Sequence, residues 1–121
     1  MSAQVLVVDD ERDLAVACER LLARTGWTVS TVATRAAALR ALGARPALAI
    51  VDRQLPDGDG LDVVRAARAQ GTRVIVISAH TTAANRQHTL AEGATGFLPK
   101  PFSASQLLDM VRAVAGEAPR A

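Results

Sequence analysis

The chain has 121 residues, a formal net charge of +2, and hydrophobic residues at 50% of its positions. The length suits a single domain over residues 1–121, since compact domains commonly have about 100–150 residues, and the apolar share excludes a disordered chain. No apolar run reaches the roughly 18 residues of a membrane span, no secretory signal precedes the first strand, and no basic run suggests nucleic-acid binding. We therefore expect a cytoplasmic protein that contacts neither membrane nor nucleic acid directly.

Short apolar runs alternate with amphipathic segments through the first half of the chain. The runs that predict strands are residues 4–8, 27–32 and 48–52. Between the first two, Cys18 and Leu22 lie on an apolar stripe at helical spacing, and Gly26 follows as a typical helix end. Thr34 is a candidate N-cap for a second helix, which is expected to end near Gly43.

The second half continues this alternation. The expected elements are a helix at 61–69, a strand at 73–77, a helix from Thr81 or Thr82 to about Glu92, and a short strand within 93–98. Ser103 and Gln106 form a capping-box pattern that predicts a last helix. Residues 116–121 are expected to be a frayed tail or the start of a linker.

Five strand–helix units in alternation predict an α/β fold, with a parallel sheet covered by helices on both faces. Right-handed crossovers place the carboxyl end of every strand at one edge of the sheet, where ligands bind in open α/β folds. The polar residues at these strand ends are Asp9, Asp10, Asp52, Ser78 and Lys100. We expect their side chains to meet in one site.

The chemistry of these side chains points to a divalent cation and phosphoryl groups. Three converging aspartates would repel one another, and oxygen ligands without nearby histidine or cysteine suit Mg²⁺, with Mn²⁺ as an alternative. Lys100 is the only lysine of the chain, which indicates that an ammonium group is specifically required. A metal, this ammonium and the Ser78 hydroxyl can bind phosphoryl oxygens, while the Asp52 carboxylate can act as a nucleophile.

In its motifs the chain resembles the receiver domain of two-component response regulators. The motifs are Val7-Val8-Asp9-Asp10-Glu11, Val51-Asp52 with Leu55-Pro56-Asp57-Gly58, Ile77-Ser78-Ala79, and Phe97-Leu98-Pro99-Lys100-Pro101-Phe102. They stand in the order of the family, each at the end of an expected strand, and the resemblance covers essentially the whole chain. It implies the chemotaxis-regulator-like fold, a flavodoxin-like doubly wound sheet of five parallel strands in the order 2-1-3-4-5.

The resemblance implies that Asp52 accepts a phosphoryl group from a phosphohistidine on a sensor histidine kinase or a histidine phosphotransfer protein. It implies that Asp10 binds Mg²⁺ directly, that Asp9 does so mostly through water, and that the backbone carbonyl of Gln54 is a further ligand beside Asp52. Lys100 would pair with Asp52 and then with the phosphoryl group. Such a domain is a self-catalysed phosphoacceptor that can lose its own phosphate, and it is not an enzyme in the usual sense.

The resemblance also implies a conformational switch. Ser78 would move toward a phosphoryl oxygen, and Phe97 would turn inward into the space that Ser78 vacates. The face formed by the fourth helix, the fifth strand and the fifth helix would then meet an output domain, a partner protein or a second copy of the chain. Gly96 stands where the winged-helix subfamily usually has an acid used in dimer contacts, which argues against that particular dimer.

Further positions flank the implied site. By resemblance, Gln54, Ala79 and His80 tune how long the phosphate lasts. We expect His80 to affect the approach of water and the small Ala79 to leave room for the phosphoryl group. The Lys100–Pro101 peptide bond is expected to be cis, which proline permits at low cost.

Other interpretations stay open on the sequence. Asp9 and Asp10 could be no more than helix caps, and Ser78 and Phe97 could be a loop serine and a core residue. A nucleotide-binding domain would need a glycine-rich turn after the first strand, where this chain has acids. A metal-dependent phosphatase with an aspartate nucleophile usually carries an Asp-x-Asp pattern there, and a non-phosphorylated, receiver-like interaction module would be expected to lack one of the key residues.

Overall fold

The computed structural model describes residues 3–116, so most of the tail expected at 116–121 lies outside the described residues. The strands are β1 (Gln4–Val8), β2 (Thr28–Val32), β3 (Leu48–Asp52), β4 (Gln54–Leu55), β5 (Gly58–Asp59), β6 (Arg73–Ser78) and β7 (Gly96–Pro99). The helices are α1 (Arg12–Arg24), α2 (Arg35–Ala41), α3 (Leu61–Ala69), α4 (Ala83–Ala91) and α5 (Ala104–Ala115), with a 3-10 turn, η1 (Leu42–Ala44), after α2. Within residues 3–116, no helix combines the length and the apolar character that crossing a membrane takes.

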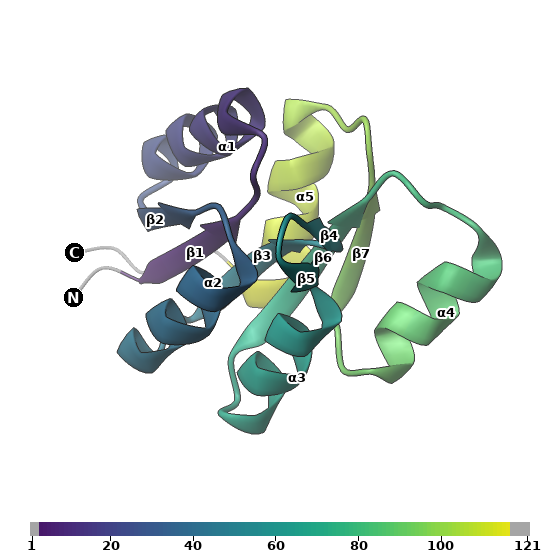
Figure 1. Cartoon of the computed structure of the whole chain (residues 1–121). Coiled ribbons are helices and arrows are strands. Elements are labelled where there is room, and N and C mark those ends of the chain that lie inside the picture. Colours follow the sequence, from purple (N-terminus) through teal and green to yellow (C-terminus); the bar gives the residue numbers. More distant parts are fainter. Residues whose placement is uncertain (1–2, 117–121) are drawn as a thin grey trace.

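The main sheet has five parallel strands in the order β2-β1-β3-β6-β7, as Figure 1 shows. Strands β4 and β5 pair only with each other, in a short antiparallel hairpin beyond the end of β3. When this hairpin is set aside, the observed order is the predicted 2-1-3-4-5 arrangement. The flavodoxin-like α/β fold expected from the sequence is therefore confirmed.

Some boundaries differ from the prediction for local reasons. Strand β2 begins at Thr28, because the backbone N–H of Trp27 donates to the carbonyl oxygen of Leu22 at the end of α1 (3.2 Å). Ser78, expected just after the fourth strand, is the last residue of β6 and pairs with Pro99. The β4–β5 hairpin was not predicted, since strands of two residues are too short to show an alternating pattern.

Polar side chains cap the amino-terminal ends of three helices, as predicted. Thr34 accepts a backbone N–H of α2 (3.1 Å), and Thr82 accepts the N–H of Asn85 (3.2 Å), so the second of the two threonines proposed for α4 is its cap. Ser103 and Gln106 form the reciprocal capping box of α5. These caps satisfy N–H groups that have no partner within the first turn of a helix.

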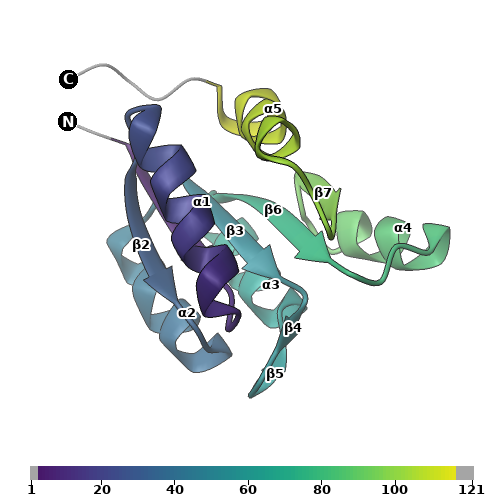
Figure 2. The same cartoon turned by 90° about the horizontal axis from the view of Figure 1, so that it is seen from above.

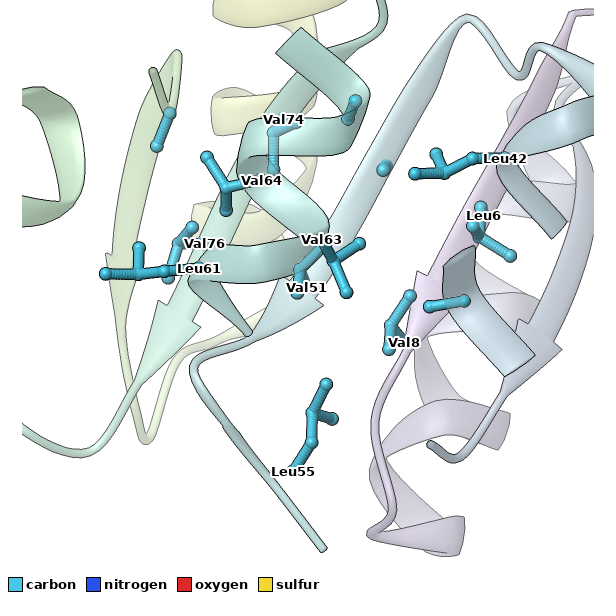
Figure 3. Close-up of a cluster of buried hydrophobic side chains, with 14 of the residues drawn as sticks. Leu6, Val8, Leu42, Val51, Leu55, Leu61, Val63, Val64, Val74 and Val76 are labelled. Atoms are coloured by element: carbon cyan, nitrogen blue, oxygen red, sulfur yellow. The ribbon is translucent and has the colours of Figure 1, made fainter. Parts of the chain in front are cut away.

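Two layers of helices enclose the sheet. Helices α1 and α5 pack on one face and α2 and α3 on the other, which Figure 1 and Figure 2 show from two directions. On the second face, Val63 and Val64 of α3 lie in one cluster with Val51 and Val76 of the strands (Figure 3). Strand β3 is buried over its whole length, which explains its unbroken apolar run.

The strands reach one edge of the sheet together. Val8 of β1 pairs with Val51 of β3, and Ser78 of β6 pairs with Pro99 of β7. Because all pairings in this sheet are parallel, the residues that follow these positions lie along the same edge. The fold thus brings the polar strand ends together, as the sequence predicts.

Gly60 lies where the chain folds back onto the end of β3 and enters α3. A Cβ atom at this position would overlap the backbone carbonyl oxygen of Asp52 and would lie 3.0 Å from the Cα of Arg53. We predict that Gly60→Ala lowers the free energy of unfolding by about 2 kcal/mol, because an added methyl group that meets backbone forces the chain to shift. Urea unfolding followed by circular dichroism measures this loss.

Gly43→Ala is the matched control, since a Cβ atom at Gly43 in η1 meets no other atom within 4 Å. This substitution should leave stability unchanged or raise it by up to about 1 kcal/mol, through a smaller entropy of the unfolded chain. Equal losses in the two variants would contradict the steric explanation.

Candidate functional site

Asp52 is the last residue of β3 and is 95% buried, with a relative exposure of 5%. Its Oδ1 accepts the backbone N–H of Gln54 (3.0 Å), and its Oδ2 accepts a hydrogen bond from Nζ of Lys100 (2.9 Å). Both carboxylate oxygens therefore have a partner, and the side chain is held at the edge of the sheet. The carboxylate that could act as a nucleophile is thus fixed in position and paired with an ammonium group.

Asp9 and Asp10 follow β1 and lie beside Asp52. Asp9 is buried and Asp10 is exposed, and one oxygen from each of the three carboxylates lies within 4.8 Å of the others. Oδ1 of Asp9 accepts the backbone N–H of Glu11 (2.8 Å), whereas its buried Oδ2 has no hydrogen bond. Nζ of Lys100 lies 3.3 Å from that oxygen, close enough for attraction although no hydrogen bond forms.

Burial raises the pKa of Asp9 to about 6, and the nearby Asp52 adds to this effect. The hydrogen bond from the Glu11 N–H and the charge of Lys100 act in the opposite direction and only partly compensate. A buried carboxylate oxygen without a hydrogen bond, next to two more carboxylates, is a donor set that fits a hard divalent cation. The residues present therefore fit the Mg²⁺ expected from the sequence.

Lys100 follows β7 and brings the only positive charge within reach of this acidic cluster among the ion pairs of residues 3–116. Its Nζ lies 2.9 Å from Asp52, 3.0 Å from Glu11 and 3.3 Å from Asp9. Although burial lowers the pKa of Lys100, its hydrogen bonds to Asp52 and Glu11 outweigh this effect and raise the pKa above its ordinary value. The side chain is therefore a permanent cation, and the Lys100–Pro101 peptide bond behind it is cis.

Glu11 is the one partner of Lys100 that the sequence analysis did not single out. Its side chain is 63% exposed, and it holds the ammonium from the solvent side. The signal for it was present, because Glu11 is the third of three consecutive acids after β1. The sequence analysis assigns a role in metal binding to Asp9 and Asp10 and none to Glu11.

Ser78 and Phe97 lie beneath the polar edge. Ser78 is 1% exposed, and its Oγ accepts the backbone N–H of His80 (3.0 Å) and lies 3.4 Å from the carbonyl oxygen of the same residue. Its hydroxyl is thus engaged within its own loop. Phe97 of β7 is 3% exposed and belongs to the apolar cluster that contains α3.

The three flanking residues divide between two neighbouring cavities. Gln54 and Ala79 line the cavity of about 360 Å³ around Asp52 and Lys100. His80 lines the next cavity, where its ring contacts the side-chain amide of Gln54. The Gln54 side chain therefore separates the two cavities, and His80 contacts it from the second cavity.

The assembled site joins a buried carboxylate, an ammonium group and two more carboxylates around a cavity large enough for a phosphoryl group. Residues 5–112 of the chain match the family described as the response regulator receiver domain. The chain belongs to this family. It is thus a receiver domain of two-component signalling, a phosphoacceptor and not a classical enzyme.

Curated relatives and solved structures agree with this assignment. The transcriptional regulatory protein PrrA of Mycobacterium leprae is 40% identical over 116 residues, covering 93% of this chain and 50% of the relative. The response regulator MprA of Mycobacterium ulcerans is 35% identical over 117 residues, covering 94% of this chain and 50% of the relative. The chain thus spans about half the length of these two relatives.

Two solved structures show the same fold. The chemotaxis protein CheY4 of Vibrio cholerae has a TM-score of 0.84 and 33% identity, covering 94% of this chain and 99% of that one. The receiver domain of the Francisella response regulator 1452 has a TM-score of 0.85 and 26% identity, covering 92% and 94%. Receiver domains bind Mg²⁺ at an acidic pocket, and the carboxylate cluster of this chain corresponds to such a pocket.

Removing the central ammonium should destabilise the receiver domain in metal-free buffer. We predict that Lys100→Met lowers the free energy of unfolding by about 3 kcal/mol, because the buried carboxyl groups of Asp52 and Asp9 would lose their cationic partner. Urea unfolding in the presence of a chelator measures the loss. In the control variant Glu11→Gln, which removes an exposed partner, the loss should stay below about 1 kcal/mol; a loss as large as that of Lys100→Met would mean that burial is not the cause.

Proposed function

We propose that Asp52 accepts a phosphoryl group from a phosphohistidine of a sensor histidine kinase or a histidine phosphotransfer protein. The observation that carries this proposal is the sharing of one ammonium group: Nζ of Lys100 lies within 3.3 Å of Asp52, Asp9 and Glu11 at the edge where the strands end. Phosphoryl transfer depends mainly on positioning of the reacting groups and on neutralisation of their charge. This arrangement supplies both.

The transfer step requires no further reactant. One carboxylate oxygen of Asp52 forms a bond to phosphorus while the bond between phosphorus and the histidine nitrogen breaks, and that nitrogen keeps the electron pair. Lys100, already 2.9 Å from Asp52, holds the carboxylate in place and then faces the phosphoryl oxygens. The backbone N–H of Gln54 fixes the other carboxylate oxygen (3.0 Å).

The metal site that supports this step is assigned to Asp9, Asp10 and Asp52, with the backbone carbonyl of Gln54 as a further ligand. The Asp9 oxygen without a hydrogen bond supports this assignment. Mg²⁺, or Mn²⁺ in its place, supplies neutralisation of phosphoryl charge when bound. The exposed Asp10 leaves the site open to an ion from solution.

The proposed output is a change in the surface formed by α4, β7 and α5. Ser78 would exchange its bond with His80 for one with a phosphoryl oxygen, and Phe97 would adjust to the space that Ser78 leaves. Arg86, Leu98 and Met110 line a cavity on this surface, which is where an output domain or partner protein would bind.

Gly96 supports the expectation that one particular dimer is absent. A Cβ atom at Gly96 would lie 2.7 Å from Sδ of Met110 and 3.1 Å from Val114. An acidic residue could enter this position only if the side chains of Met110 and Val114 moved. Dimerisation through this surface would therefore need contacts other than an acid at position 96.

Phosphorylation by a small donor tests the proposal. Incubation with acetyl phosphate and Mg²⁺ should add one phosphoryl group, visible as a mass increase of the intact protein, and Asp52→Asn should abolish it because the nucleophilic oxygen is lost. Chelation of the metal should slow the reaction by at least about a hundredfold, since the phosphoryl charge would then face uncompensated carboxylates.

Asp57→Asn is the control, because Asp57 also lies near the end of β3 but its exposed carboxylate accepts backbone N–H groups of Arg35 and Ala36 at the start of α2, away from the acidic cluster. This variant should be labelled like the wild type. Labelling that persists in Asp52→Asn would place the acceptor elsewhere and overturn the proposal.

The lifetime of the phosphate should depend on the contact between His80 and Gln54. We predict that His80→Ala speeds the loss of phosphate by roughly threefold to tenfold, because Gln54 loses its support and water gains access to the acyl phosphate. Intact mass, followed after removal of the donor, measures the rate. His88→Ala is the control, because His88 is an exposed histidine of α4, and it should leave the rate unchanged. An unchanged rate of phosphate loss in His80→Ala would refute the role of His80.

A further inference from the structure

Arg53 directly follows Asp52, yet its side chain leads away from the carboxylates to α4. Its Nε donates to Oδ1 of Asp59 in β5 (2.9 Å), and its Nη1 donates to Oδ1 of Asn85 (2.5 Å) and to Oγ1 of Thr89 (2.9 Å). The side chain is 16% exposed. One guanidinium group thus joins the end of β3, the β4–β5 hairpin and two successive turns of α4.

The α4 end of this contact continues toward Ser78. The side-chain amide of Asn85 donates to the carbonyl oxygen of His80 (2.6 Å), and the backbone N–H of His80 donates to Oγ of Ser78 (3.0 Å). A line of hydrogen bonds therefore runs from Arg53 through Asn85 and the loop after β6 to the Ser78 hydroxyl. Thr89 anchors the same helix, since its hydroxyl donates to the backbone carbonyl of Asn85 (2.8 Å).

This contact matters because α4 has little apolar packing of its own. Thr89 is its only buried residue, whereas α3 buries four and α5 buries three. A further polar link of the α4 region, the ion pair of Arg65 with the C-cap residue Glu92, is at the surface, with the Arg65 side chain 50% exposed. Hydrogen bonds of a charged donor in a mostly buried place contribute more than such a surface pair.

At the hairpin end of the contact, Asp59 has a second partner besides Arg53. Burial raises the pKa of Asp59, but the Leu61 N–H and Arg53 outweigh this and keep the pKa below its ordinary value. Oδ1 of Asp59 also accepts the backbone N–H of Leu61 at the start of α3 (2.9 Å). Arg53 is therefore attached on one side to a carboxylate that is itself bonded to the start of α3, and on the other side to a weakly packed helix.

We propose that Arg53 is a positioning residue that holds α4 and the loop after β6 in the arrangement seen here. Its hydrogen bonds to Asp59, Asn85 and Thr89, called the clasp below, then couple the state of Asp52 to the position of α4. The coupling rests on the proposed function of Asp52. When Ser78 turns to a phosphoryl oxygen, His80 and Asn85 shift. The hydrogen bonds from Arg53 to Asn85 and Thr89 must then break. Without the clasp, the alternative arrangement is more populated before phosphorylation, and the domain accepts phosphate more readily.

Hydrogen–deuterium exchange of the full chain without donor tests the clasp. Arg53→Met keeps the length and apolar stem of the side chain but removes its donors. The exchange of amides at 83–92 should rise by about tenfold, as a helix loses its main anchor. Arg65→Met is the matched control, because it also removes an arginine contact to the α4 region, and its effect should stay below about threefold.

Unchanged exchange of α3 and the central strands verifies that Arg53→Met is folded. Should it not fold, Thr89→Val removes the hydroxyl partner on α4 at nearly constant volume, and the exchange of α4 should then rise at least about threefold. Equal exchange of α4 in Arg53→Met and Arg65→Met would overturn the clasp. If Arg53→Met does not fold, unchanged exchange of α4 in Thr89→Val would overturn it instead.

The coupling is read from acetyl phosphate labelling with Mg²⁺. Arg53→Met should be labelled about threefold faster than the wild type and Arg65→Met at the wild-type rate, because only the first shifts the population of competent molecules. Faster exchange of α4 with unchanged labelling would reduce Arg53 to a structural contact and overturn the coupling. Failure to label even the wild type would instead refute the proposed function of Asp52, while the exchange result without donor would still decide the clasp.

Discussion

One ammonium group held among three carboxylates is the interaction on which this receiver domain depends. Asp52 and Asp9 are buried at the edge of the sheet, and Lys100 reaches both of them as well as Glu11. The compensation is incomplete, since one oxygen of Asp9 has no hydrogen bond and its pKa is raised to about 6. The same imbalance that costs stability would favour a bound divalent cation, so the demands of folding and of the proposed phosphate chemistry would conflict at this edge.

The fold separates a rigid part from a part that can move. Strand β3 is buried along its length, and Gly60 packs its turn against the carbonyl oxygen of Asp52, so the backbone at Asp52 has little freedom. Helix α4 buries only Thr89 and depends on polar contacts. Elements with few buried apolar contacts open at lower free energy than core strands. The proposed phosphorylation of Asp52 would therefore affect α4 more easily than the core.

The sequence predicted the fold and the meeting of Asp9, Asp52 and Lys100 because strand period and crossover handedness determine which residues share an edge. It could not reveal the Asp9 oxygen without a hydrogen bond, since that depends on burial and on angles at Lys100. Arg53 also escaped notice. In the sequence it is an ordinary charged residue, and its partners on α4 are 32 and 36 positions away. Local pattern carries no information on such contacts.

Two arrangements of similar free energy are what a switch requires, and the surroundings of Ser78 show how these could be achieved. A buried hydroxyl that lost its partner would cost about 1–3 kcal/mol, which would disfavour any movement. In this structure the Ser78 hydroxyl is bonded to His80, so the proposed move to a phosphoryl oxygen would exchange one hydrogen bond for another. The main cost of the move would then fall on the bonds that Asn85 makes to His80 and to Arg53, at the surface of a weakly packed helix. A single phosphoryl group and its interaction with Lys100 would have to supply the difference in free energy between the two arrangements.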